Sequence, residues 1–91
     1  MIERVELKIS GMVQGVCYRY FAIDKAKPLG IKGYVRNSSD GAVYIVAEAD
    51  TKVLKDFIKI LKKGPYPARV DNVQENWQSA LNEFSSFEIR Y

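Results

Sequence analysis

Residues 31–48 read Ile31-Lys32-Gly33-Tyr34-Val35-Arg36-Asn37-Ser38-Ser39-Asp40-Gly41-Ala42-Val43-Tyr44-Ile45-Val46-Ala47-Glu48, and this stretch decides the fold class. Its two ends, residues 31–36 and 42–48, are rich in β-branched and aromatic residues, which are typical of strands. The polar loop between them ends in Asp40-Gly41, a dipeptide typical of hairpins, so we expect two adjacent antiparallel strands. Both faces of the second strand are apolar, which predicts an interior position in a sheet.

A helix is expected on each side of this hairpin, because apolar residues recur there at helical spacing. The stripe before the hairpin is formed by Tyr18, Ala22, Ala26 and Leu29. The stripe after it is formed by Leu54, Phe57, Ile58 and Leu61. Pro28 predicts that the first helix ends or bends near Ala26 to Lys27. The second helix is expected to have Asp50 or Thr51 as its cap and to stop at Gly64-Pro65.

Three further strands complete the sheet. Val5, Leu7 and Ile9 alternate with polar residues, as in a strand with one buried face. Residues 68–77 predict another strand, with a bulge near Asp71-Asn72, and residues 87–91 a short last one. The order β-α-β-β-α-β predicts an α+β, ferredoxin-like sandwich: an antiparallel sheet with two helices on one face and an additional C-terminal strand.

Composition limits both the organisation and the chemistry. The chain has 91 residues, 47% apolar and 27% charged, so we expect a single domain over residues 1–91. It has no histidine and one cysteine, which excludes histidine bases, His-ligated metals, internal disulfides and Cys-rich zinc sites. The net charge of +3 suits a small anion better than a nucleic acid. Without a membrane-length apolar run or a signal-peptide pattern, we expect a cytoplasmic protein with no membrane partner.

The loop between the first strand and the first helix is the candidate site. Gly11 and Gly15 let its backbone N–H groups converge near the positive end of the helix dipole, where anions bind. Arg19 follows within the first turn, and its planar fork can hold two phosphate oxygens. The loop matches neither the Walker A motif nor a dinucleotide fingerprint. From these residues alone, a phosphate site and a tight turn beside an ordinary surface arginine both remain open.

Two longer motifs give this loop a family resemblance. Residues 11–19, Gly11-Met12-Val13-Gln14-Gly15-Val16-Cys17-Tyr18-Arg19, resemble the acylphosphatase loop signature G-x-V-Q-G-V-x-[F/Y]-R. Residues 29–41, from Leu29-Gly30 to Asp40-Gly41, resemble that family's second signature, L-G-x-x-G-[W/Y]-V-x-N-x-x-[D/K]-G. Residues 87–91 resemble its C-terminal strand. The resemblance covers the whole chain and implies a βαββαβ sandwich that hydrolyses acyl phosphates to a carboxylate and inorganic phosphate.

The resemblance also implies residue roles. Arg19 matches the family's phosphate-binding arginine and Asn37 its water-orienting asparagine, so both are expected to be catalytic. Backbone N–H groups of a phosphate-binding loop would assist Arg19, and this loop is formed by Gln14, Gly15, Val16, Cys17 and Tyr18. No metal or cofactor is expected, because the carboxylate leaves readily and the reaction depends on positioning and charge stabilisation. The expected partners are a small-molecule acyl phosphate, with inorganic phosphate as product and competitive inhibitor, and the expected state is a monomer.

Two other interpretations were weighed. A non-catalytic anion- or RNA-binding module could use aromatic residues on the open sheet face, and the chain has six Tyr, four Phe, one Trp and a pI of about 9.0. No RNP-like strand motif is present, which counts against RNA. A cysteine phosphatase would need an arginine at position 23, which is Ile23. Cys17 could also be a nucleophile near a helix N-terminus, but the work of the loop is assigned to backbone N–H groups, so we interpret Cys17 as a small apolar loop residue turned toward the core.

Overall fold

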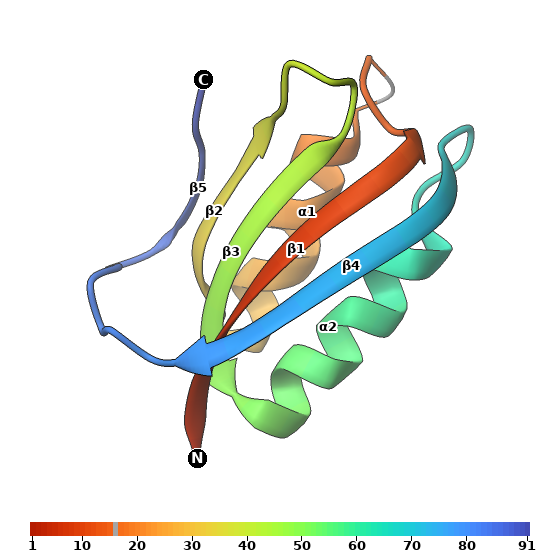
Figure 1. The fold of residues 1–91 in the computed structure, drawn as a ribbon. Helices are drawn as coiled ribbons and strands as arrows, with labels where there is room; N and C mark the ends of the chain where they lie inside the picture. The colour runs from red at the N-terminus through yellow and green to blue at the C-terminus, as the bar shows by residue number, and fades with distance from the viewer. Residues whose placement is uncertain (16) are drawn as a thin grey trace.

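The computed structural model describes residues 1–15 and 17–91. The elements follow the chain as β1 (Ile2–Met12), α1 (Tyr18–Ala26), a 3₁₀ helix (Lys27–Leu29), β2 (Lys32–Asn37), β3 (Val43–Asp50), α2 (Thr51–Lys63), β4 (Arg69–Ser79) and β5 (Phe87–Ile89). The strands form one sheet in the order β4-β1-β3-β2-β5. Figure 1 shows both helices on the same face of this sheet. The ferredoxin-like α+β class is confirmed.

The predicted hairpin and helix ends are present. β2 and β3 pair antiparallel, and β3 lies between β1 and β2, which confirms its interior position. Asp50 caps α2 by accepting a hydrogen bond from the backbone N–H of Lys52 at 3.1 Å. The α-helical part of α1 ends at Ala26 as expected. Leu29 was expected on its buried stripe, but it lies beyond that end, in the 3₁₀ helix, and is 37% exposed.

The core lies between the sheet and the helices. Its fully buried members include Val5, Leu7, Ile9, Ile45, Leu54, Phe57 and Leu61. Burying each such side chain contributes about 1.5–3 kcal/mol to folding. Tyr18 is also buried, and its hydroxyl donates to the Leu61 carbonyl at 2.7 Å. Burial raises the pKa of the Tyr18 phenol, so the hydroxyl stays a donor and ties the first turn of α1 to α2.

The β1–β4 pairing contains the predicted bulge, at the point where β1 leads into the candidate loop. The register changes from Ser10 opposite Asn72 to Gly11 opposite Val70, so Asp71 is the extra residue. Gly11 has φ +135°, and a Cβ there would collide with the Arg69 carbonyl oxygen. Only glycine therefore lets the two backbones approach this closely while β1 changes direction.

The C-terminal strand corrects one detail of the prediction. β5 pairs with β2 in parallel, so the sheet is mixed and not antiparallel throughout. The reason is the crossing from one edge of the sheet to the other: β4 ends at the end of the sheet where β2 begins (Figure 1). A chain that crosses this end and turns back can only run in the direction of β2.

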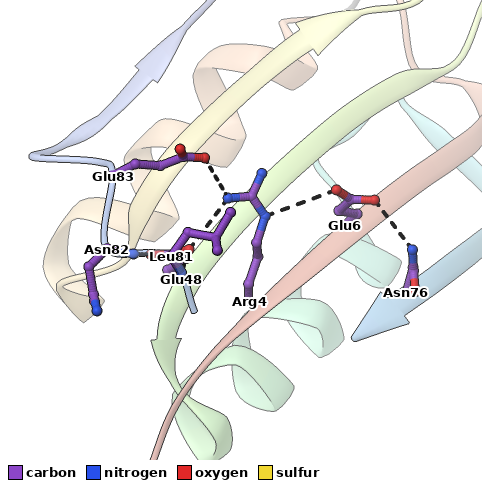
Figure 2. A network of polar contacts seen from close by, with 7 residues as sticks. All are labelled: Arg4, Glu6, Glu48, Asn76, Leu81, Asn82 and Glu83. Atoms are coloured by element: carbon purple, nitrogen blue, oxygen red, sulfur yellow. Dashed lines mark hydrogen bonds and ion pairs between the residues drawn. The ribbon is translucent and has the colours of Figure 1, made fainter. Parts of the chain in front are cut away.

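An ion cluster on the open face fixes this crossing (Figure 2). Arg4 is only 9% exposed, and its guanidinium contacts Glu83 at 2.8 Å and Glu48 at 3.5 Å. Glu48, 5% exposed, also accepts the backbone N–H groups of Leu81 at 2.8 Å and Asn82 at 3.0 Å. Burial disfavours the Arg4 charge, but these two carboxylates outweigh it and raise the pKa of Arg4. The cluster thereby anchors the segment that leads to β5.

Candidate functional site

A pocket of about 230 Å³ lies where the loop after β1, the first turn of α1 and the end of β2 meet. It is lined by Val13, Gly15, Cys17, Tyr18, Arg19, Tyr20 and Asn37. Most of the predicted site residues therefore surround one hollow, including Arg19 and Asn37, which are far apart in sequence. Val16, predicted for the phosphate-binding loop, lies outside the described residues.

The first turn of α1 offers backbone donors to the pocket. Its first N–H groups have no acceptor within the helix and carry the positive end of the helix dipole. Cys17 is the N-cap residue and its side chain makes no capping hydrogen bond. Tyr18, Arg19 and Tyr20 of this turn line the pocket, so the pocket lies at the N-terminal end of the helix. The arrangement is suited to binding an anion.

Cys17 itself corrects the sequence interpretation. Its backbone is left-handed, with φ 61° and ψ 23°, and its side chain is exposed and not turned toward the core. The next residue, Tyr18, fills the core position, and the left-handed turn leaves the thiol at the surface. This conformation is costly for a residue with a Cβ.

Arg19 supplies the positive charge of the pocket. It is half-buried, and its Cζ lies 5.1 Å from the ring centroid of Tyr91, in a cation–π contact. The ion pairs formed within residues 1–15 and 17–91 do not include Arg19. Its donors are therefore not taken up by a neighbouring carboxylate and are available to an anion.

Asn37, the last residue of β2, supplies a polar group to the pocket lining. Its Oδ1 is buried and accepts no hydrogen bond from the part of the chain that is described. Buried polar atoms in folded proteins nearly always have a partner, which is water or a ligand when it is not protein. An amide oxygen held in this way can accept a hydrogen bond from a water molecule and fix the orientation of that water.

Gln14 joins the two halves of the site. Its Nε2 donates to the carbonyl oxygens of Ser38 and Ala42, both at 2.8 Å. Its side chain therefore ties the candidate loop to the hairpin that follows Asn37 and does not line the pocket. The hairpin is held further by Asp40, which pairs with Lys8 at 2.7 Å and accepts from the Ala42 N–H at 3.1 Å. These bonds lower the pKa of Asp40 to about 2, so it is ionised at neutral pH.

Residues 1–15 and 17–91 contain neither a cluster of metal-ligating side chains nor a membrane-spanning helix. No group of three or more Cys, Asp, Glu or His side chains among them is placed to hold a metal ion. No helix in this part of the chain has both the length and the apolar character needed to cross a bilayer.

Some pocket residues were not predicted. Tyr20, next to Arg19 in the sequence, and Val13 both line the pocket. Tyr91 reaches Arg19 from the far end of the chain. Val13 lies inside the quoted loop motif and Tyr20 follows it directly, so their positions in the sequence were a usable signal. No such signal pointed to Tyr91, because its contact with Arg19 depends on the parallel direction of β5.

A loop, a helix start and an arginine surround one hollow that is suited to an anion, and they lie on a ferredoxin-like sheet; together they define a small α+β domain with one candidate anion site. Comparison with known proteins gives the family. Residues 5–89 match the acylphosphatase family. An acylphosphatase of Caldanaerobacter subterraneus is 45% identical over 89 residues, covering 98% of this chain and 99% of that protein.

Solved structures agree. The acylphosphatase of Bacillus subtilis superposes with a TM-score of 0.95 at 31% identity, with 100% of both chains covered. That of Coxiella burnetii gives 0.90 at 31% identity, covering 98% of this chain and 93% of the other. The chain belongs to the acylphosphatase family. It is an enzyme, a hydrolase that acts on acid anhydrides, and its small-molecule substrates are acyl phosphates.

Proposed function

We propose that the chain cleaves the carboxyl–phosphate bond by direct, metal-independent attack of a water molecule. The observation that carries this is the pocket itself, which is lined by Arg19, the first turn of α1 and Asn37, whose Oδ1 has no hydrogen-bond partner among residues 1–15 and 17–91. Arg19 and Asn37 are the proposed catalytic residues. In this proposal residues 1–91 act as a single domain and as a monomer, with inorganic phosphate as product and competitive inhibitor. The cytoplasmic location stays a prediction.

Arg19 and the loop hold the phosphoryl group. The guanidinium is proposed to bind two of its equatorial oxygens, and backbone N–H groups of Gln14, Gly15, Cys17 and Tyr18 to bind the others. Val16 belongs to the same proposed loop. Such donors stabilise the charge that spreads over these oxygens in the transition state. Two structural features support the assignment: the guanidinium stacks on Tyr91, and it forms no ion pair with a described carboxylate.

Asn37 orients the nucleophile. Its Oδ1 accepts a hydrogen bond from one O–H of the water, which aims a lone pair of the water oxygen at phosphorus in line with the leaving oxygen. As the new O–P bond forms, the P–O bond to the acyl group breaks and its electron pair leaves with the carboxylate. The carboxylate is a weak base, so it needs little protonation, and the proton of the water passes to the phosphate product.

Hydrolysis without a metal or a phosphoenzyme is the first expectation. The purified chain is expected to hydrolyse benzoyl phosphate at full rate in excess EDTA, because its sequence has no histidine and the proposed site depends on Arg19 and backbone donors. With ¹⁸O-labelled water, a single turnover is expected to place the label in inorganic phosphate. Loss of turnover in chelator, or a trapped ³²P-labelled protein, would contradict direct attack by water.

Cys17 offers a second test, because a thiol in an anion-binding loop could be a nucleophile. We expect Cys17→Ala and Cys17→Gly to keep substantial kcat, since the loop acts through its backbone. The glycine variant is expected to be more stable than the alanine variant by about 1 kcal/mol, because glycine adopts the left-handed backbone at this position without the steric cost of a Cβ. Urea unfolding and kcat measure both effects. A fall of about 10⁴ in kcat of folded Cys17→Ala would make the thiol the nucleophile.

The binding-module alternative has less support. The two tyrosines of β2 and β3 on the open face are covered by the chain's own arginines. Arg90 lies 4.2 Å from the ring centroid of Tyr34, and Arg36 lies 5.0 Å from that of Tyr44. Bases could stack there only after displacing these guanidinium groups.

A further inference from the structure

A second hollow lies beside the phosphate pocket. It is a groove of about 720 Å³ between α1 and the α2–β4 connection, two segments that reach the same end of the molecule as the candidate loop (Figure 1). Its walls include Tyr20, Phe21 and Ile23 on one side and Pro65, Tyr66 and Pro67 on the other. Tyr20 is 60% exposed and Tyr66 is 99% exposed. Large apolar side chains gathered at the surface around one hollow are typical of a binding site.

The groove is continuous with the pocket. The two hollows share Gly15, Cys17 and Tyr20, whereas Asn37 lines only the pocket. In-line attack requires the leaving group to lie on the side of phosphorus opposite the water. With the water held at Asn37, the acyl group is directed away from Asn37. The groove adjoins the pocket at the three shared residues and is not lined by Asn37, so it can receive the acyl group.

We propose that this groove binds the acyl group of the substrate, and that the chain favours acyl phosphates with an aromatic or branched apolar acyl group. The inference rests on the proposed function, because the phosphoryl position sets the direction of the acyl chain. Tyrosine rings and proline faces bind flat apolar groups well, and such contacts require no charge on the ligand. Asp24 is the acidic side chain of the lining, which disfavours an acyl chain that carries a second carboxylate.

The test compares benzoyl phosphate with acetyl phosphate, whose methyl group is too short to reach the Tyr66 side of the groove. The measured quantity is kcat/KM for benzoyl phosphate divided by kcat/KM for acetyl phosphate. This ratio is compared between each variant and the wild type, because the comparison cancels the different reactivities of the two leaving groups. Tyr66→Ala is expected to lower this ratio about three- to tenfold, mainly through a higher KM for benzoyl phosphate. Tyr66→Phe keeps the ring and is expected to keep the ratio.

Leu81→Ala is the matched control, because Leu81 is equally a large exposed apolar residue but lines neither hollow. It is expected to leave both rates unchanged. A ratio that stays constant in both Tyr66→Ala and Tyr20→Ala, or an equal fall for both substrates, would overturn the acyl-site assignment while leaving the hydrolase intact. If the wild-type chain turned over neither substrate, the proposed function itself would fail, and the inference with it.

Discussion

Arg19→Lys is expected to fold normally and to lose about 10²–10³ of kcat/KM for benzoyl phosphate. Lysine keeps the charge, but one ammonium group cannot present two parallel donors to two phosphoryl oxygens. It also replaces the guanidinium that makes the cation–π contact with Tyr91. The loss is expected in both kcat and the affinity for inorganic phosphate, because Arg19 binds the same oxygens in the substrate, the transition state and the product.

The matched control is Arg69→Lys. Arg69 is exposed on β4, pairs with Asp71 at 2.9 Å and lies outside the pocket, so its variant is expected to retain wild-type rates. Circular dichroism and urea unfolding establish that both variants fold. A folded Arg19→Lys protein with near-native kcat/KM would remove Arg19 from the site.

The local elements of the fold were predictable because each has a local cause. The alternation of Val5, Leu7 and Ile9 and the stripe of Leu54, Phe57 and Leu61 indicate which face is buried, and burial is what the structure shows. The β1–β4 bulge was predictable from broken alternation alone. The direction of β5 was not, because it depends on a chain crossing that is fixed by contacts between distant residues.

Arg4 and Glu48 show why such contacts escape sequence analysis. They lie 44 residues apart, and Arg4 and Glu83 lie 79 apart. Each looks like an ordinary outward-facing charge in its own strand or loop. Their role in anchoring the segment before β5 becomes visible only when the sheet brings them together and this segment covers them. The same holds for Tyr91, whose contact with Arg19 exists only because β5 runs parallel to β2.

The candidate site was predictable to the extent that its residues lie within two sequence motifs. Arg19 and Asn37 were named from those motifs, and the structure places both on one pocket. What the motifs did not reveal is how the halves are joined. Gln14 does this with two hydrogen bonds across 24 and 28 residues, which gives its side chain a positioning role. The acyl groove could not be predicted for a similar reason, since Tyr20 and Tyr66 are far apart in sequence and line one groove only in the folded chain.

Asn37→Ala is expected to lower kcat about 10²-fold or more, because the attacking water loses the acceptor that aims it at phosphorus. KM and the inhibition constant of inorganic phosphate are expected to stay nearly unchanged, since the phosphoryl oxygens are held by Arg19 and the loop. Stability is expected to change by less than about 1 kcal/mol, because Asn37 Oδ1 has no hydrogen-bond partner among the described residues to lose. The measurements are kcat, KM and the inhibition constant of inorganic phosphate, and urea unfolding measures the stability of the variant.

Asn72→Ala serves as the control for this prediction, because Asn72 is exposed on β4 and lines no part of the pocket. Its kcat is expected to match that of the wild type. The informative comparison is between the two proposed catalytic residues. Arg19→Lys should weaken phosphate inhibition, and Asn37→Ala should not, because one residue binds the anion and the other binds the water. If inorganic phosphate ceased to compete in folded Asn37→Ala, Asn37 would be a phosphate ligand, and the attacking water would need another residue to orient it.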